Sequence, residues 1–261
     1  MANKNVGFII GFSALAFLIA LLSCAMNMAP SQIANSLPQS ELKYYCDSFD
    51  SLREDVWERA GFVFNAAQLG NIKIADMTIE DGKLRIDTKT GGFSKGGLVS
   101  KFALRGNFDV QVDFKINFVP GNLDMDQSLG FGAMEKTIGG TGNRTTSIGL
   151  LKKGQNKGVI FSGYLEWGKY HNGYGHPIGN FNGSVRFLRT NDHVTTFYRK
   201  QGQNQWTKMC TLPSSQNDTT IGFGLQNFVS DRNTITANLS VSGWIDNFII
   251  NAAQQIIESE I

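Results

Sequence analysis

Hydrophobic and polar residues alternate without a break over residues 107–118, N-F-D-V-Q-V-D-F-K-I-N-F. A period of two places the six apolar side chains on one face of a β-strand and the polar side chains on the other. In an α-helix the same spacing would scatter the apolar side chains round the whole circumference. The pattern therefore predicts a strand with one buried and one hydrated face, which is typical of an antiparallel sheet.

Shorter runs of the same kind follow, and glycine or Asn/Asp turns such as Asp81-Gly82 and Asn172-Gly173 separate them. The other predicted strands include residues 84–88, 185–189, 194–199, 206–212, 220–225 and 244–250. Only residues 52–60 and 252–259 are expected to form short helices in the body of the chain. Many short strands without crossover helices predict an all-β fold, a two-sheet antiparallel sandwich or jelly roll.

An apolar run precedes these strands and has no charged residue between Lys4 and Glu41. Residues 6–26 would form a helix about 31 Å long, which is enough to cross a hydrocarbon core of roughly 30 Å. Three interpretations stay open: a cleaved signal peptide, a lipoprotein signal and a retained signal anchor. Leu21-Leu22-Ser23-Cys24 resembles a bacterial lipobox, in which Cys24 would be lipidated.

The charges beside the apolar run predict export. Lys4 precedes it and little positive charge follows it, so the body of the chain is expected outside the cytoplasm. We expect a protein of the cell envelope or cell surface, tethered to the membrane through residues 6–26 or through lipidated Cys24. The predicted organisation is an export segment (1–26), a flexible linker (27–42), a sandwich domain (43–251) and a C-terminal tail (252–261).

The charge and the cysteine content of the chain exclude some classes of binding partner. The formal net charge is +2, and the chain lacks the Lys/Arg clusters that phosphate binding requires, so nucleic acid is not an expected partner. Cys46 and Cys210 could form a disulfide in an oxidising compartment, although two buried free thiols are an equal alternative. No C-x-x-C or Cys/His spacing suggests a structural zinc site.

The order of the motifs resembles that of a known superfamily. The motifs are C-D-S-F-D-S-L-R-E-D-V-W-E, G-K-L-R-I-D-T, G-G-L-V-S-K-F-A-L-R-G-N-F-D-V-Q-V-D-F, G-S-V-R-F-L-R-T-N-D-H-V-T-T-F-Y-R, Q-W-T-K-M and V-S-G-W-I-D-N-F-I-I-N. In this order they resemble the concanavalin A-like lectin/glucanase superfamily, in its laminin-G-like branch, over residues 44–251. The resemblance implies a jelly roll in which residues 46–49 lie near residues 245–248. It also implies an extracellular, often carbohydrate-related role, but no particular activity.

The superfamily's hydrolase motif is missing. Laminarinase-type members contain an E-x-D-x-x-E strand, whose two carboxylates lie about 5–5.5 Å apart. That motif occurs nowhere in the chain, and the polar face of residues 107–118 contains no glutamate. Glu166 is the single acid in residues 136–181, and a partner would have to come from Asp124, Asp126 or Glu135. We find no complete catalytic motif, which argues against an enzyme, and Glu166 remains the candidate acid/base.

An aromatic segment, residues 162–179, is the main candidate for ligand binding. Aromatic rings offer flat apolar surfaces for sugar rings, and neighbouring polar groups can bond the hydroxyls. The predicted ligand-binding residues are Tyr164, Glu166, Trp167, Tyr170, His171, Asn172, Tyr174 and His176. In the alternative interpretation, Tyr164 and Trp167 are core residues and the other rings cover a loop.

Two further sites are weaker candidates. Arg186, Arg189, Tyr198 and Arg199 could line a concave sheet, although cross-strand charge pairing explains them equally well. Asp124 and Asp126 could supply oxygen ligands to Ca²⁺, the one cofactor that the sequence suggests.

Three functional hypotheses follow from these patterns. The first is an exported, membrane-tethered, lectin-like module that binds glycans through residues 162–179 without covalent chemistry. The second is a polysaccharide-degrading hydrolase or lyase of the same fold. The third is an accessory subunit of a membrane assembly that uses the sandwich to dock another protein.

Overall fold

The fold is a sandwich of mainly antiparallel strands, as the sequence predicts. The described residues contain one short helix, at residues 39–45, whereas the prediction of a short helix over residues 52–60 is wrong, because residues 57–59 form a strand there. The computed structural model describes residues 33–59, 72–120, 125–136, 144–166, 169–229 and 239–258. Within these ranges the elements are α2 (Gln39–Tyr45), β1 (Trp57–Arg59), β2 (Ile72–Ile74), β3 (Asp76–Glu80), β4 (Lys83–Asp87), β5 (Phe93–Ile116), β6 (Met125–Glu135), β7 (Arg144–Lys153), β8 (Val159–Glu166), β9 (Lys169–Pro177), β10 (Phe181–Thr190), β11 (His193–Lys200), β12 (Thr207–Pro213), β13 (Thr219–Val229) and β14 (Ser242–Glu258).

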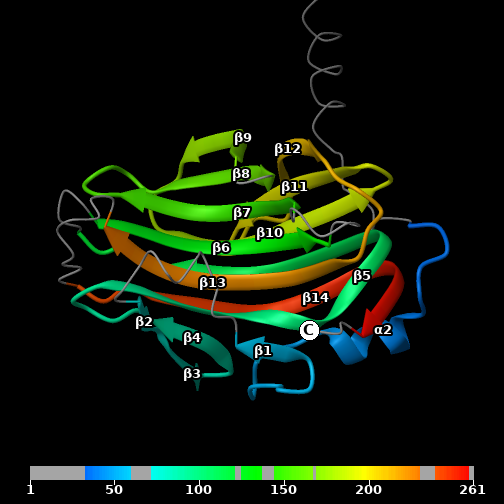
Figure 1. Ribbon diagram of the computed structural model, residues 1–261, viewed down its shortest axis with the longest axis horizontal. Helices are drawn as coiled ribbons and strands as arrows, with labels where there is room; N and C mark the ends of the chain where they lie inside the picture. The colour runs from blue at the N-terminus through cyan, green and yellow to red at the C-terminus, as the bar shows by residue number, and fades with distance from the viewer. Residues whose placement is uncertain are drawn as a thin grey trace, which may run out of the picture. The chain divides into compact units, whose positions relative to one another are not determined.

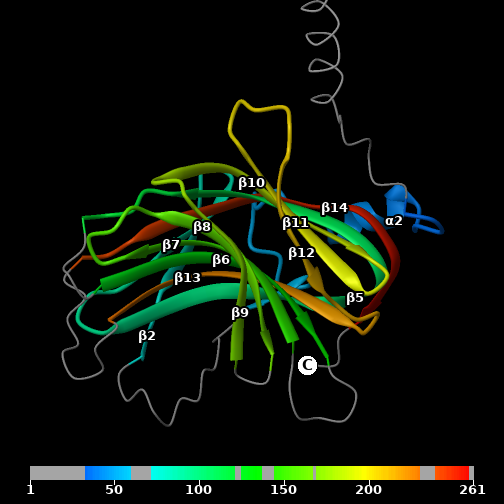
Figure 2. The same cartoon turned by 90° about the horizontal axis from the view of Figure 1, so that it is seen from above.

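The long strand β5 belongs to both layers (Figure 1). Its first half, residues 93–104, pairs with β13, and the sheet continues through β6, β7, β8 and β9. Its second half pairs with β10 on one side and β14 on the other, and that layer continues to β11 and β12. In the view of Figure 2, β10 and β14 run along one side of the body, and β6 and β13 along the other. All of these pairings are antiparallel, whereas β2 pairs with β5 in parallel.

The core lies between the two layers, where the alternating residues of β5 meet β6. Phe108, Val110, Val112, Phe114 and Ile116 are at most 1% exposed, which confirms the predicted strand over residues 107–116, although β5 ends at Ile116, before Phe118. From the opposite layer, Phe131 stacks on Phe187 at 4.6 Å between ring centroids. Burying each such aromatic ring contributes roughly 1.5–3 kcal/mol, so this face holds the layers together.

The first motif pairs with the last strand, as the resemblance implies. The Asp47 amide donates to the Phe248 carbonyl oxygen at 2.9 Å, and the Phe248 amide donates to the Asp47 carbonyl oxygen at 2.8 Å. The Asp47 carboxylate is also buried, and burial raises its pKa. It accepts hydrogen bonds from Trp57 Nε1 and the Phe49 amide, each at 2.7 Å. One side chain therefore fixes the turn after the first motif and the indole of Trp57.

The substitution Asp47→Ala should destabilise the protein by about 2–4 kcal/mol, because it leaves two buried N–H groups without an acceptor. Urea unfolding measures this loss. Asp55→Ala is the matched control, since Asp55 is half-exposed and pairs with Arg53 at the surface. The control should cost less than about 1 kcal/mol. Equal losses for the two variants would contradict the structural role given to Asp47.

The packed domain extends past both predicted boundaries. Residues 33–42 belong to the predicted flexible linker, yet Leu42 is fully buried and the Leu37 amide donates to the Ala253 carbonyl oxygen at 2.8 Å. At the other end, residues 252–258 continue β14 instead of forming the predicted tail or short helix. Apolar residues such as Ala252 and Ala253 are buried there, which explains the longer strand.

Both remaining cysteines are free in the structure, so the disulfide between Cys46 and Cys210 does not form. Cys46 Sγ accepts a hydrogen bond from the Ile250 amide at 3.3 Å, beside β14. Cys210 belongs to β12, and its Sγ lies 3.5 Å from Oγ1 of Thr196 on β11. Burial raises the pKa of the Cys46 thiol, as expected of an inert structural cysteine.

Several predicted features lie outside the described residues. They are the export segment 1–26 with Cys24, the proposed calcium ligand Asp124, and Trp167. Within the described ranges, no helix has both the length and the apolar character that crossing a membrane requires.

Candidate functional site

A trough of about 170 Å³ lies on the outer face of the sheet made by β5, β13, β6 and β7. Its floor comes from two strands with the same tripeptide, Gly130-Phe131-Gly132 on β6 and Gly222-Phe223-Gly224 on β13. The two tripeptides pair in register, Gly130 with Gly224 and Gly132 with Gly222. Both phenylalanines point into the core, so the outer face of both strands is bare backbone here.

Glycines continue across the neighbouring strands, where Gly97 of β5 pairs with Gly224, and Gly149 of β7 pairs with Gly130. These two neighbouring glycines are covered: the Phe161 ring lies over Gly149, and the β13 backbone lies against Gly97. We call the row Gly97, Gly224, Gly130 and Gly149 the glycine row. A methyl group on Gly130 would meet its nearest atom only at 3.9 Å, so the space above it is open. Glycine inside a strand weakens the sheet and often marks a place where a ligand or another backbone approaches closely.

Aromatic rings stand beside this floor. The Phe161 ring lies over Gly149, where an added Cβ atom would collide with it. The Tyr170 hydroxyl lies over Gly163 in the same way, and the two rings meet edge to face at 6.3 Å. Burial raises the pKa of Tyr170, so its hydroxyl is a neutral donor at physiological pH. The site thus combines a flat floor with an aromatic side, an arrangement that suits sugar rings.

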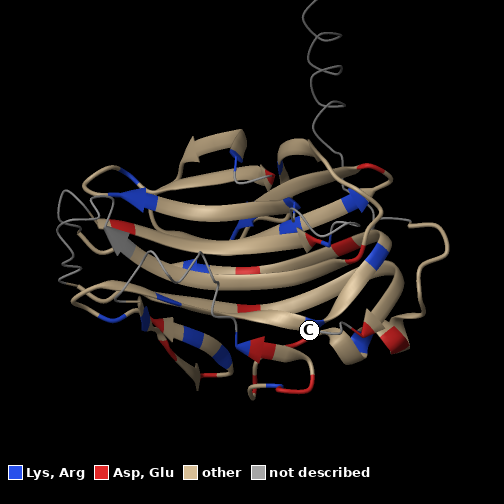
Figure 3. Cartoon of the chain, viewed as in Figure 1, with Lys and Arg blue, Asp and Glu red and all other residues tan. Residues whose placement is uncertain are grey.

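One cation lines the trough. Lys95 of β5 is 4% exposed, and its ammonium has no hydrogen-bond partner in the part of the chain that the structure describes. Its closest aromatic contact is the Phe93 ring, whose centroid lies 5.9 Å from Nζ. Burial lowers the pKa of Lys95. β13 contains no charged residue, so the floor itself is neutral (Figure 3).

Carboxylates are scarce around the trough. In the described parts of β6, β7, β8 and β13, and in β5 as far as Leu104, there are three acidic residues: Asp126, Glu135 and Glu166. Glu135 accepts a hydrogen bond from Ser214 Oγ at 2.6 Å, and Glu166 pairs with Arg144, both on the opposite face of the sheet. Only Asp126 is on the trough face, two residues before Ser128 on β6, and it is buried.

The predicted aromatic platform does not assemble as one surface. β8 and β9 pair as a hairpin, so their side chains alternate between two faces. Tyr164 stacks on His171 at 4.6 Å, beside the Arg144–Glu166 pair, on the face away from the trough. Tyr174 and His176 belong to that face too, with their ring centroids 6.5 Å apart. Tyr170 and Asn172 are on the trough face.

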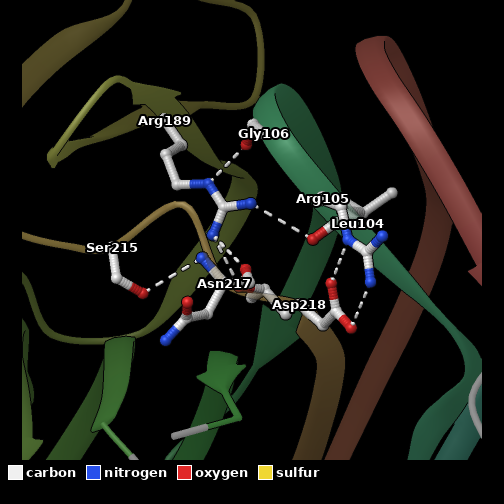
Figure 4. A network of polar contacts seen from close by, with 8 residues as sticks. Leu104, Arg105, Gly106, Arg189, Ser215, Asn217 and Asp218 are labelled. Carbon is white, nitrogen blue, oxygen red and sulfur yellow. Dashed lines mark hydrogen bonds and ion pairs between the residues drawn. The ribbon is translucent and has the colours of Figure 1, made fainter. Parts of the chain in front are cut away.

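The four residues predicted to line a concave sheet, Arg186, Arg189, Tyr198 and Arg199, also lie in different environments. Arg186 forms a buried ion pair with Asp109, and Arg199 lies over the Trp206 ring at 4.5 Å. Arg189 is fully buried and Tyr198 nearly so, because both lie on the core face of their strands. Arg189 donates to backbone carbonyls at one end of the sandwich (Figure 4). These four residues therefore do not line one concave sheet.

The described residues contain no group of three or more His, Cys, Asp or Glu side chains that could hold a metal ion. Asp126 is the described half of the predicted calcium pair, and its partner Asp124 lies outside the described ranges.

The structure is similar to solved glucanases. No protein-family model matches the sequence, and no curated protein matches it. A Bacillus licheniformis β-glucanase aligns over 84% of this chain and 99% of its own, with a TM-score of 0.56 and 16% identity. A Bacteroides ovatus mixed-linkage glucan GH16 protein in complex with a G4G4G3G product aligns over 78% of this chain and 98% of its own, with a TM-score of 0.57 and 13% identity.

A third similar structure is a prokaryotic β-1,3-1,4-glucanase (lichenase) from a mouse hindgut metagenome. It aligns over 78% of this chain and 97% of its own, with a TM-score of 0.53 and 10% identity. The fold is the concanavalin A-like jelly roll. The jelly-roll fold that the motif resemblance implies is thereby confirmed.

These neighbours correct the functional hypothesis. The first hypothesis, a lectin-like module without covalent chemistry, is contradicted because the similar structures are glucanases. They favour the second hypothesis, a polysaccharide-degrading hydrolase of the same fold.

Sequence reasoning missed the trough and Lys95. The signal was present in two stretches, S-L-G-F-G-A-M and T-I-G-F-G-L-Q, where glycine takes every outward position around a core phenylalanine. Each stretch alone is consistent with a strand that merely contains turn-forming glycines. Only their pairing in register turns the two stretches into a floor.

Proposed function

We propose that the protein is a hydrolase that cleaves polysaccharide chains bound along the glycine row. The observation that supports this most directly is the pair of G-F-G strands, which leaves open space on the outer face of a sheet. The glucanase neighbours share this fold, which makes a glycan the first substrate class to test.

The trough offers suitable contacts for sugars. The peptide groups of the floor are engaged in the sheet, so the floor presents a flat surface to the apolar C–H groups of a sugar ring. Polar side chains at its margins can bond the hydroxyl groups of the sugar. These side chains are Ser128, Thr145, Ser147 and Gln226.

Asp126 is the proposed general acid. In the proposed step Asp126 gives its proton to the leaving glycosidic oxygen as the C–O bond breaks, and the resulting carboxylate then takes a proton from the water molecule that adds to the anomeric carbon. Asp126 is the described carboxylate on the trough face, about 7 Å along β6 from Ser128 by strand geometry. Glu166, the candidate from sequence, is held by Arg144 on the other face, so we do not assign it this role.

Release of reducing ends from β-1,3-glucan and mixed-linkage glucan by the full-length chain tests this proposal. Asp126→Asn should lower kcat by about 100-fold or more, because general acid catalysis contributes roughly 10²–10⁴-fold. Glu166→Gln should change kcat by no more than about threefold, because Glu166 belongs to a partly buried ion pair with Arg144 on the face away from the trough. An inactive wild-type chain, or an Asp126→Asn variant with full activity, would refute the proposal.

We also propose that the protein works outside the cytoplasm, on the basis of the apolar run and Lys4 alone. Fractionation of cells expressing the full-length chain, with accessibility to added protease, tests this location. Protection from protease in intact spheroplasts would contradict it.

A further inference from the structure

Lys95 differs from the other buried cations of the described chain. Three cationic side chains are buried there: Lys95, Arg186 and Arg189. Arg186 has a carboxylate partner, Asp109, at 2.6 Å, and Arg189 donates to four oxygen acceptors. Lys95 Nζ has no such partner among the described residues. An unpaired buried ammonium is costly, so its retention at the trough calls for a functional explanation.

The surroundings of Lys95 form a polar row next to the glycine row. Lys95 pairs in register with Gln226 of β13, which pairs with Ser128 of β6. All three residues line the trough. The polar row is two residues along each strand from the glycine row, a distance of about 7 Å. A sugar ring over the glycines could therefore direct a ring substituent toward the ammonium, the amide and the hydroxyl.

We propose that Lys95 binds an anionic substituent, a carboxylate or a sulfate ester, on a polysaccharide that lies in the trough. The substrate class is then an acidic polysaccharide. This inference rests on the proposed function to the extent that the trough is the glycan site. A bound anion would supply the missing partner of the ammonium, and the Gln226 amide and Ser128 hydroxyl would donate to the same group.

Calorimetric titration of the full-length chain with three oligosaccharides of equal length tests the inference. One oligosaccharide contains uronic acids, one is sulfated, and one is a neutral glucan. The wild-type chain should bind one of the two acidic ligands at least about 10-fold more tightly than the neutral one, since a charged hydrogen bond is worth that much or more. The acidic ligand that binds identifies the source of the anion.

Three variants measure how much the positive charge of Lys95 contributes to ligand binding. Lys95→Met keeps the length of the side chain and removes its charge, and should weaken acidic-ligand binding by about 10- to 100-fold while changing neutral binding by less than about twofold. Lys95→Arg keeps the charge and should retain most of the affinity. Lys73→Met is the matched control on the neighbouring strand β2, because Lys73 is exposed and donates to the Thr90 carbonyl oxygen.

The thermal midpoint separates binding from folding. Lys95→Met should raise Tm by about 2–4 °C, because it removes an unpaired buried charge. A more stable variant that has lost acidic-ligand binding would support a functional lysine. Unchanged acidic-ligand binding in Lys95→Met, or a wild-type preference for the neutral glucan, would overturn the inference.

The outcomes also distinguish this inference from the proposed function. If the chain cleaves neutral glucan and ignores acidic ligands, the hydrolase stands and the anionic substituent is rejected. If it binds an acidic ligand through Lys95 and cleaves nothing, the binding inference stands and the catalytic role of Asp126 is rejected. If it binds none of the three ligands, both proposals fail.

Discussion

Gly130→Val is expected to lower glycan turnover by about 100-fold or more while leaving the fold intact. The open space above Gly130 would receive two methyl groups, directly on the proposed path of the sugar chain. Misplacing a substrate by about 1 Å can cost roughly 100-fold in rate, and a filled floor displaces it further. Valine favours strands, so the free energy of unfolding should stay within about 1 kcal/mol of the wild type. Reducing-end assays and urea unfolding measure the two effects.

Gly175→Val provides the matched control for this prediction. Gly175 is exposed on the edge strand β9, and a methyl group there would meet its nearest atom at 3.7 Å. It has similar room and continues the register of the glycine row, but it lies three strands away from Gly130, beyond the Phe161 ring that covers Gly149 and bounds the floor. The control should keep its activity. Equal activity in both variants would show that the substrate does not bind over the glycine row.

Arg189→Ala is expected to destabilise the protein by about 3–5 kcal/mol, the largest loss of stability that we predict. The guanidinium donates to the carbonyl oxygens of Gly106 at 2.6 Å, Asn217 at 3.0 Å and Leu104 at 3.1 Å. It joins the end of β10 to β5 and to the start of β13 (Figure 4). Burial lowers its pKa to about 10, so Arg189 is still charged at neutral pH. Alanine would leave these carbonyls without donors and a cavity beside the Phe108 ring.

Arg105→Ala is the control for this prediction, and it belongs to the same network (Figure 4). Arg105 forms two bonds to Asp218, at 2.6 and 2.9 Å, but its side chain is 49% exposed. Its loss should destabilise the protein far less than the loss of Arg189, because solvent screens surface ion pairs. Urea unfolding at neutral pH compares the two variants. If Arg105→Ala cost as much as Arg189→Ala, burial would not be the reason for the stability of the network.

Strand periodicity made the fold predictable from the sequence. The alternation over residues 107–118 requires one buried face, and five of its side chains form part of the core. The same periodicity, followed strictly, would also have placed Arg189 inside, because it continues the row of Val185 and Phe187. Its charge suggested a solvent-exposed position. The structure places it inside because main-chain oxygens satisfy the guanidinium there.

The candidate site was much less predictable. The aromatic residues 162–179 are adjacent in sequence, but the β8–β9 hairpin sends Tyr164 and Tyr170 to opposite faces of the sheet. The trough comes from Lys95, Gly130 and Gly224, which are distant in sequence and form no motif. Each G-F-G stretch can be seen in the sequence, but only the pairing of the strands brings the two stretches together with Lys95.

The sequence by itself determined the all-β class and the antiparallel sandwich, because side-chain period is a local property of the chain. The pairing of the first motif with the last strand followed from the resemblance of the motif order to a known superfamily. Only the tertiary structure decided that two G-F-G strands lie side by side in register and that a buried lysine lies beside them with no hydrogen-bond partner among the described residues. Register depends on how all the strands pack over a shared core, and this packing brings distant residues together.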